Sequence, residues 1–123
     1  MKNNILLGAL GESAAAEYLA SLGYTVRERN FRTPHGEIDI IATDGDRTVF
    51  IEVKTRTAVK DSRYGRPSSA VSYQKQKSFV SAVKVYQGLF PESNKCRIDV
   101  IEVYYLNGKT EIKHIKSAFG DVR

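Results

Sequence analysis

Residues Gly36 to Arg56, with the sequence GEIDIIATDGDRTVFIEVKTR, decide the fold. Two runs rich in β-branched residues flank the pair Gly45-Asp46, a pattern typical of a tight β-hairpin. Successive side chains of a strand point to opposite faces, so each run has two predicted faces. In the first run Ile38 and Ile40 are predicted to share a face, and in the second run the two faces are Val49, Ile51 and Val53 against Phe50, Glu52, Lys54 and Arg56.

The turn sets the register between the two runs. A two-residue or a four-residue loop at Gly45-Asp46 gives the same register, whereas an odd loop would set Asp39 against the aliphatic face of the second run. The predicted cross-strand pairs are Asp44 with Arg47, Asp39 with Glu52, and Glu37 with Lys54. Two carboxylates in opposed positions repel each other unless a positive charge lies between them. Lys54 and a divalent cation are the two candidates for that charge.

The spacing Asp39-x12-Glu52-x-Lys54 is the pattern of metal-dependent nucleases written PD-(D/E)xK. Carboxylate oxygens suit Mg²⁺ or Mn²⁺ and leave several waters on the ion. The ion stabilises the charge that builds on an attacked phosphate. A lysine beside it can orient or deprotonate the attacking water. The sequence therefore predicts a nuclease site with Asp39, Glu52 and Lys54 as its catalytic residues.

Length and composition indicate one soluble globular domain over residues 1–123. Hydrophobic residues make up 41% and charged residues 27% of the chain, which is typical neither of a disordered nor of a membrane-spanning protein. The apolar run near the N-terminus is cut short at Glu12, so it predicts a helix and not an export signal. The single cysteine, Cys96, allows no disulfide within the chain and no Cys/His zinc cluster, which favours a reducing cytoplasm.

Basic residues gather directly after the carboxylates. The chain has a net charge of +5, and the segment 54–84 carries eight basic residues and one acidic residue. Such a block suits a polyanionic partner, although a solvated basic face is the alternative. The predicted nucleic-acid contacts are Arg56, Lys60, Arg63, Arg66 and Lys77.

The remaining patterns predict an α/β fold. A helix over residues 6–22 ends at Gly23, and a strand over 24–31 leads through the turn 33–36 into the hairpin. His35, in that turn, is expected to be a bystander. A basic loop over 56–67 precedes a second helix, which starts after Pro67 with Ser68 or Ser69 as its cap and runs to Gln87. Strands over 96–105 and 110–115 are joined by Asn107-Gly108. The order is helix, three strands, helix, two strands, with a mixed central sheet flanked by the helices.

Three further positions have both a structural and a functional interpretation. Glu12 lies at the rim of the apolar face of the first helix, where it suits the helix macrodipole or serves as an extra metal ligand. Lys75 lies on an inward-facing row of the second helix, so it either extends outward to solvent or reaches a phosphate or a metal-bound water. Gln74 is its neighbour and a weaker candidate. Arg97 and Asp99 share a strand face and are predicted to form a structural ion pair.

Motifs along nearly the whole chain also carry a family resemblance: Gly11-Glu12, Gly23-Tyr24, Arg29-Asn30, Gly36 to Ile41, Phe50 to Arg56, Ala70-Val71 with Lys75, Arg97 to Val100, and Ser117 to Phe119. They resemble the bacterial YraN family, a largely uncharacterised family grouped with restriction-endonuclease-like folds. Its relatives include the archaeal Holliday-junction resolvases, which are dimeric enzymes that cut four-way DNA junctions.

The resemblance implies a restriction-endonuclease-like fold and a residue set for the site. The implied metal ligands are Glu12, Asp39, Glu52 and the main-chain carbonyl of Val53, with Lys54 as the catalytic lysine; Glu37, Lys75 and Gln74 are the expected accessory residues. The resemblance further implies Mg²⁺ or Mn²⁺ as cofactor, DNA as partner and a homodimer. The alternative is a nucleic-acid-binding module that has this fold and no catalysis.

Overall fold

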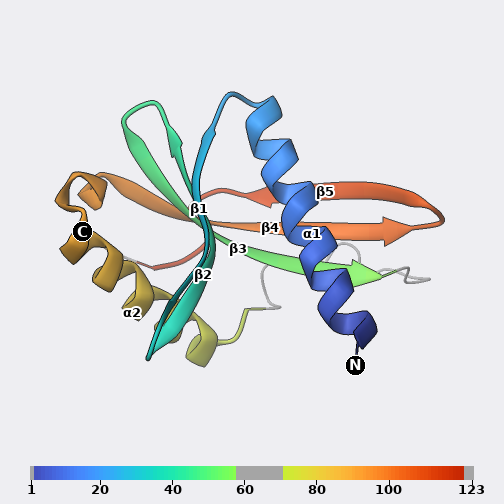
Figure 1. Cartoon of the computed structure of the whole chain (residues 1–123), viewed down its shortest axis with the longest axis horizontal. Coiled ribbons are helices and arrows are strands. Elements are labelled where there is room, and N and C mark those ends of the chain that lie inside the picture. Colours follow the sequence, from blue (N-terminus) through green and yellow to red (C-terminus); the bar gives the residue numbers. More distant parts are fainter. Residues whose placement is uncertain (1, 58–70, 121–123) are drawn as a thin grey trace.

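The computed structural model describes residues 2–57 and 71–120. Its elements, coloured along the chain in Figure 1, are α1 (Lys2–Ser21), β1 (Thr25–Thr33), β2 (Gly36–Asp44), β3 (Arg47–Thr57), α2 (Tyr73–Leu89), the 3₁₀ helix η3 (Pro91–Asn94), β4 (Cys96–Leu106) and β5 (Lys109–Ile115). The five strands form one sheet in the order β1-β2-β3-β4-β5. Strands β3 and β4 are parallel and the other neighbours are antiparallel. This is the element order and mixed sheet that the sequence predicted for a restriction-endonuclease-like fold.

The β2–β3 hairpin has the predicted register. Asp44 pairs with Arg47, and the ladder continues to Ile40 opposite Ile51. Gly45 has a φ of +66°, a left-handed conformation that a glycine adopts without strain. The regular ladder ends one pair before Asp39 and Glu52, because the two strands separate at that point. The predicted pairing of Glu37 with Lys54 is wrong, because the β2–β3 ladder has already ended at Ile40 and Ile51; on its other side, Glu37 pairs with Arg32 of β1.

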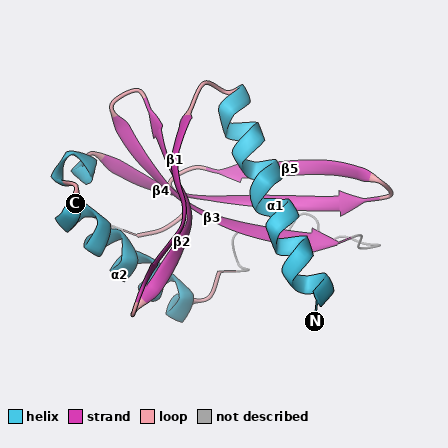
Figure 2. Ribbon diagram, in the orientation of Figure 1, coloured by secondary structure: helices cyan, strands magenta, loops and turns pink. Residues whose placement is uncertain are grey.

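The two helices cover opposite faces of the sheet (Figure 2). Val49 and Ile51 pack in one buried cluster with residues of α1, whereas Phe50 packs in a second cluster with residues of α2. The faces predicted for β3 are therefore confirmed. In β2, however, Ile38 packs on the α2 side and Ile40 on the α1 side. Their predicted shared face is wrong, at the same place where β2 leaves β3.

Helix α2 begins later than the sequence predicted. Its first residue is Tyr73, and the Ser72 side chain caps it by accepting a hydrogen bond from the Lys75 amide at 3.1 Å. The predicted start after Pro67 is therefore wrong, and the candidate caps at 68 and 69 lie outside the described residues. Arg56, predicted to begin a loop, belongs to β3. None of the helices in the described part of the chain combines the length and apolarity that a membrane crossing requires.

Candidate active site

Two buried carboxyl groups meet where β2 and β3 separate. Asp39 is 7% exposed and Glu52 is 3% exposed, although both open onto a surface groove of about 680 Å³. Beyond the last ladder pair, the Val53 amide donates a hydrogen bond of 2.8 Å to Asp39 Oδ2. The Asp39 side chain thus replaces a main-chain acceptor and is fixed against β3. The predicted neighbourhood of Asp39 and Glu52, which we call the carboxylate pair, is present.

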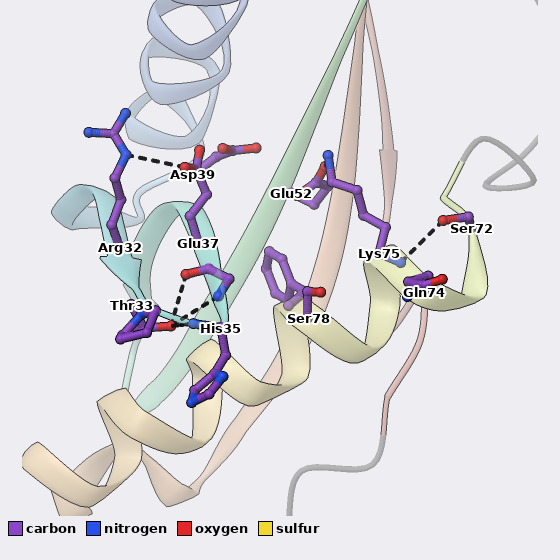
Figure 3. A pocket seen from close by; sticks show the side chains of 13 residues that line it. Arg32, Thr33, His35, Glu37, Asp39, Glu52, Ser72, Gln74, Lys75 and Ser78 are labelled. Carbon is purple, nitrogen blue, oxygen red and sulfur yellow. Dashed lines mark hydrogen bonds and ion pairs between the residues drawn. The ribbon is translucent and has the colours of Figure 1, made fainter.

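Two lysines from different elements approach Glu52. Lys54 Nζ, from β3, lies 3.8 Å from Glu52 Oε2, and Lys75 Nζ, from the first turn of α2, lies 3.3 Å from the same oxygen. Figure 3 shows the Lys75 side chain extending from α2 toward Glu52. Lys75 is half exposed, so its functional interpretation as a group beside the acids agrees with this position better than an outward extension away from them.

The proton distribution follows from this crowding. Burial first, and then the charge of Glu52, raise the pKa of Asp39 to about 8, while the hydrogen bond from the Val53 amide opposes the shift. Burial and the charge of Lys75 lower the pKa of Lys54. The charge of Glu52 raises the pKa of Lys75. At neutral pH the Asp39 carboxyl therefore holds a proton unless a further cation stabilises its charge.

Glu12 lies near the carboxylate pair but does not complete a cluster with it. It lines a neighbouring hollow of about 400 Å³ together with the pair, Val53 and Lys54. Its carboxylate lies 3.8 Å from Arg29 NH2, and its charge contributes to the raised pKa of Asp39. Within residues 2–57 and 71–120, no three Asp, Glu, His or Cys side chains come close enough to hold a metal ion.

The donor set nevertheless fits one kind of metal ion. Mg²⁺ keeps several waters and is commonly bound through one or two carboxylates plus substrate phosphates. The carboxylate pair supplies such oxygens. Burial and then the charge of Glu52 raise the pKa of Asp39, and a divalent cation would offset both effects by stabilising the ionised carboxylates. Zinc would need more nitrogen or sulfur ligands than this groove offers among the described residues.

The other predicted residues are distributed around the groove. Glu37 lines it and pairs with Arg32 at 3.2 Å, and Gln74 lines it beside Lys75. Arg56 lines the 400 Å³ hollow. Lys77 lines a third hollow of about 320 Å³. The predicted contacts Lys60, Arg63 and Arg66 lie outside the described residues.

Sequence reasoning missed part of the groove wall. His35 and Ser78 both line it, and Figure 3 shows His35 at the β1–β2 turn beside α2. Gly36 allows the start of β2 to approach α2 closely, because a Cβ at that position would collide with the Ser78 carbonyl oxygen. The signal available in the sequence was a glycine at the start of the acidic strand, where close backbone approach is a common reason for glycine.

A second polar cluster lies on the α1 face, apart from the groove. The predicted ion pair is present, with Arg97 Nε 2.9 Å from Asp99 Oδ1. His114 Nε2 lies 2.7 Å from Asp99 Oδ2, and the Tyr18 hydroxyl lies 3.0 Å from His114 Nδ1. The Ser117 amide also donates to Asp99. Because Asp99 is fully buried and has several partners, this cluster joins β4 and β5 to α1 as a structural link.

Comparisons with known proteins point to one family over nearly the whole chain. A model described as "Uncharacterised protein family UPF0102" matches residues 11–103. A UPF0102 protein of Thermodesulfovibrio yellowstonii is 44% identical over 115 residues, covering 94% of this chain and 96% of the relative. A UPF0102 protein of Caldanaerobacter subterraneus is 41% identical over 124 residues, covering 95% of this chain and 97% of the relative.

One solved structure, that of SSO0001, aligns with a TM-score of 0.36 and 19% identity; the alignment covers 96% of this chain and 54% of that chain, so this chain spans about half of that protein. The family model and the relatives confirm the resemblance to the YraN family, which is UPF0102. This chain therefore belongs to the uncharacterised protein family UPF0102.

Proposed function

We propose that this protein is a Mg²⁺- or Mn²⁺-dependent endonuclease that hydrolyses phosphodiester bonds of DNA. The single observation that supports this most is the carboxylate pair, buried at the split between β2 and β3 with Lys54 beside it. A buried acid whose pKa is raised by burial and by a neighbouring acid, in an open groove, is a feature of functional sites. The adjoining basic segment suits a polyanionic substrate.

Each residue has a role in the proposal. Asp39 and Glu52 would hold the metal ion, with the carbonyl of Val53 and, through a longer reach, Glu12 assisting. A bound ion would supply Lewis-acid stabilisation of the charge that develops on the attacked phosphate. Lys54, whose pKa is lowered by burial, would orient the attacking water and accept or release its proton.

The accessory residues would act on the substrate. Lys75 would contact the phosphate beside the acids, and Gln74 and Glu37 would shape the groove around it. Arg56 and Lys77 would bind neighbouring phosphates from two sides of the site. The substrate that the family resemblance points to is branched, junction-like DNA, on which a homodimer would act.

A non-catalytic nucleic-acid-binding module is the second candidate. The observation that favours it is the ion pairing of Glu52 with both Lys54 and Lys75, which already neutralises this carboxylate without a metal ion. Under this alternative, binding to DNA or RNA is sensitive to salt but indifferent to chelator and to Asp39→Ala.

Cleavage assays separate the two candidates. Purified protein is incubated with labelled four-way junctions, flaps, single strands and duplexes in Mn²⁺ or in EDTA. Glu52→Gln keeps the shape of the side chain and is expected to abolish cleavage, whereas Glu17→Gln, on the exposed side of α1, is the matched control and retains it. Cleavage that survives Glu52→Gln refutes the assigned site. Tight binding without cleavage by the wild type supports the non-catalytic module.

A further inference from the structure

We infer that Tyr73 and Lys77 form a stacking platform for an unpaired nucleotide next to the proposed cleavage site. The inference rests on the proposed function for the position of the cut, but the platform itself requires no catalysis. It names a substrate class: nucleic acid with a single-stranded segment adjoining the attacked phosphate.

The platform is continuous with the acidic groove. The hollow that Tyr73 and Lys77 line shares three residues, His35, Gln74 and Ser78, with the groove that contains the carboxylate pair. A strand whose phosphate lies against the pair can therefore continue from the groove into this hollow, along the first two turns of α2. The path leads away from the acids and toward exposed, uncharged or basic side chains.

Tyr73 has the properties of a stacking residue and lacks those of a core residue. Tyr73 is 75% exposed, the largest exposure among the exposed large hydrophobic residues of the described chain, and it belongs to neither buried cluster. It is held by its backbone at the start of α2, directly after the Ser72 cap. Because a tyrosine side chain has only two χ angles, its ring presents a flat apolar surface at little cost in conformational entropy.

Lys77 completes the site from the same helix face. Its Nζ lies 5.6 Å from the centre of the Tyr73 ring, one helical turn further along. One ring face is thus partnered by a cation, which leaves the other face for a base and sets a positive charge beside the phosphate of the same nucleotide. Exposed aromatic rings interleaved with basic residues are how proteins bind single strands without sequence preference.

The chemistry favours an unpaired base over a duplex. Bases within a duplex are already stacked on both faces, so a protein ring gains nothing from them unless the strand is opened. A site made only of lysines would bind paired and unpaired strands through their phosphates alike. The exposed ring is the feature that discriminates between them.

Fluorescence tests the platform directly, because the chain contains no tryptophan. Tyr73→Trp introduces a single indole at the proposed stacking position. In EDTA, a strand of about ten thymidines is expected to quench it, while an abasic strand with the same number of phosphates binds with little quenching. Equal quenching by both strands would overturn the proposal, since charge alone would then explain the signal.

Affinity measurements give the second arm. Tyr73→Ala is expected to weaken binding of the single strand about 5- to 100-fold and to leave blunt duplex binding unchanged, while Tyr73→Phe binds as the wild type does. Lys77→Ala should weaken the binding of both the single strand and the duplex, and should make the binding affinity less dependent on salt. Lys84→Ala, two turns away on the same helix, should change neither the affinity nor its salt dependence. Single-strand affinity that Tyr73→Ala leaves intact would refute the platform.

The binding arm is independent of cleavage. If the single strand binds through Tyr73 but nothing is cut in Mn²⁺, the platform stands and the nuclease proposal fails. If duplex or junction DNA is cut and Tyr73→Ala changes no single-strand affinity, the nuclease proposal stands and the platform fails.

Discussion

Replacing Asp39 by asparagine is expected to change how the stability of the protein depends on pH. Burial first and the charge of Glu52 second raise the pKa of Asp39 from its ordinary value of 3.8 to about 8 in the folded protein. The unfolded chain therefore releases this proton near pH 4, whereas the metal-free folded protein keeps it to about pH 8. The stability that the proton contributes is fully present below about pH 4 and is lost as the pH rises toward about pH 8.

The size of the effect follows from the width of this window. Each pH unit inside it lowers the free energy of unfolding by about 1.4 kcal/mol, which amounts to about 2.7 kcal/mol between pH 5 and pH 7. Asparagine keeps an oxygen for the Val53 amide but does not titrate, so the variant lacks this loss. Relative to the wild type, Asp39→Asn should therefore become more stable by about that amount over the same interval.

Urea denaturation in EDTA at several pH values measures the difference. The matched control is Asp46→Asn. Asp46 is exposed, and its hydrogen bond and ion pair with Lys95 lower its pKa, so it is ionised throughout this interval. The free energy of unfolding of this control should therefore change with pH as that of the wild type does. If the free energy of unfolding of Asp39→Asn also changes with pH as that of the wild type does, Asp39 is ionised in the folded protein and the electrostatic account of the site is wrong.

Three further outcomes are expected. Mn²⁺ should raise the melting temperature more at pH 8.5 than at pH 6, because the cation competes with a proton for the carboxylate pair; equal shifts would contradict metal binding there. Gly11→Ala should destabilise the protein by about 1–3 kcal/mol in urea denaturation, because its Cβ would collide with Thr55. Gly8→Ala, in open space on the same helix, should instead raise the free energy of unfolding by up to about 1 kcal/mol. Asp99→Asn should lower the free energy of unfolding by about 3 kcal/mol or more in the same measurement, because Arg97 loses its buried charged partner. A decrease of less than about 1 kcal/mol would refute this.

Local patterns were sufficient to predict the centre of the fold. The alternation in β3 and the turn residues Gly45-Asp46 determine which side chains face each helix and which residues pair, because both depend on neighbours along the chain. The pairing of Arg97 with Asp99 was predictable for the same reason, since residues two apart on a strand share a face.

Features that depend on tertiary contacts were not predictable in this way. Several serines precede α2 in the sequence, and each is a good cap by local propensity, so the sequence placed the start of the helix too early; the cap in the structure is Ser72. The β2–β3 ladder ends at Ile40 and Ile51, and just beyond it Ile38 packs on the α2 side, against the alternation along the strand that the sequence predicted. His114 had an available signal, because counting back from Asn107-Gly108 sets it opposite Ile101 on the face of Asp99.

The two buried aspartates distinguish a structural site from a functional one. Burial would raise the pKa of Asp99, but hydrogen bonds from His114, Arg97 and the Ser117 amide outweigh it and hold that pKa below its usual range. Asp39 accepts one hydrogen bond from the described residues, faces another acid and borders an open groove, and burial together with that acid raises its pKa. A sheet end that needed only stability would be better served by a neutral side chain at this position. The fold instead brings ionisable groups from β2, β3 and α2 to one groove, which is the arrangement expected where a cation and a phosphate are to be bound.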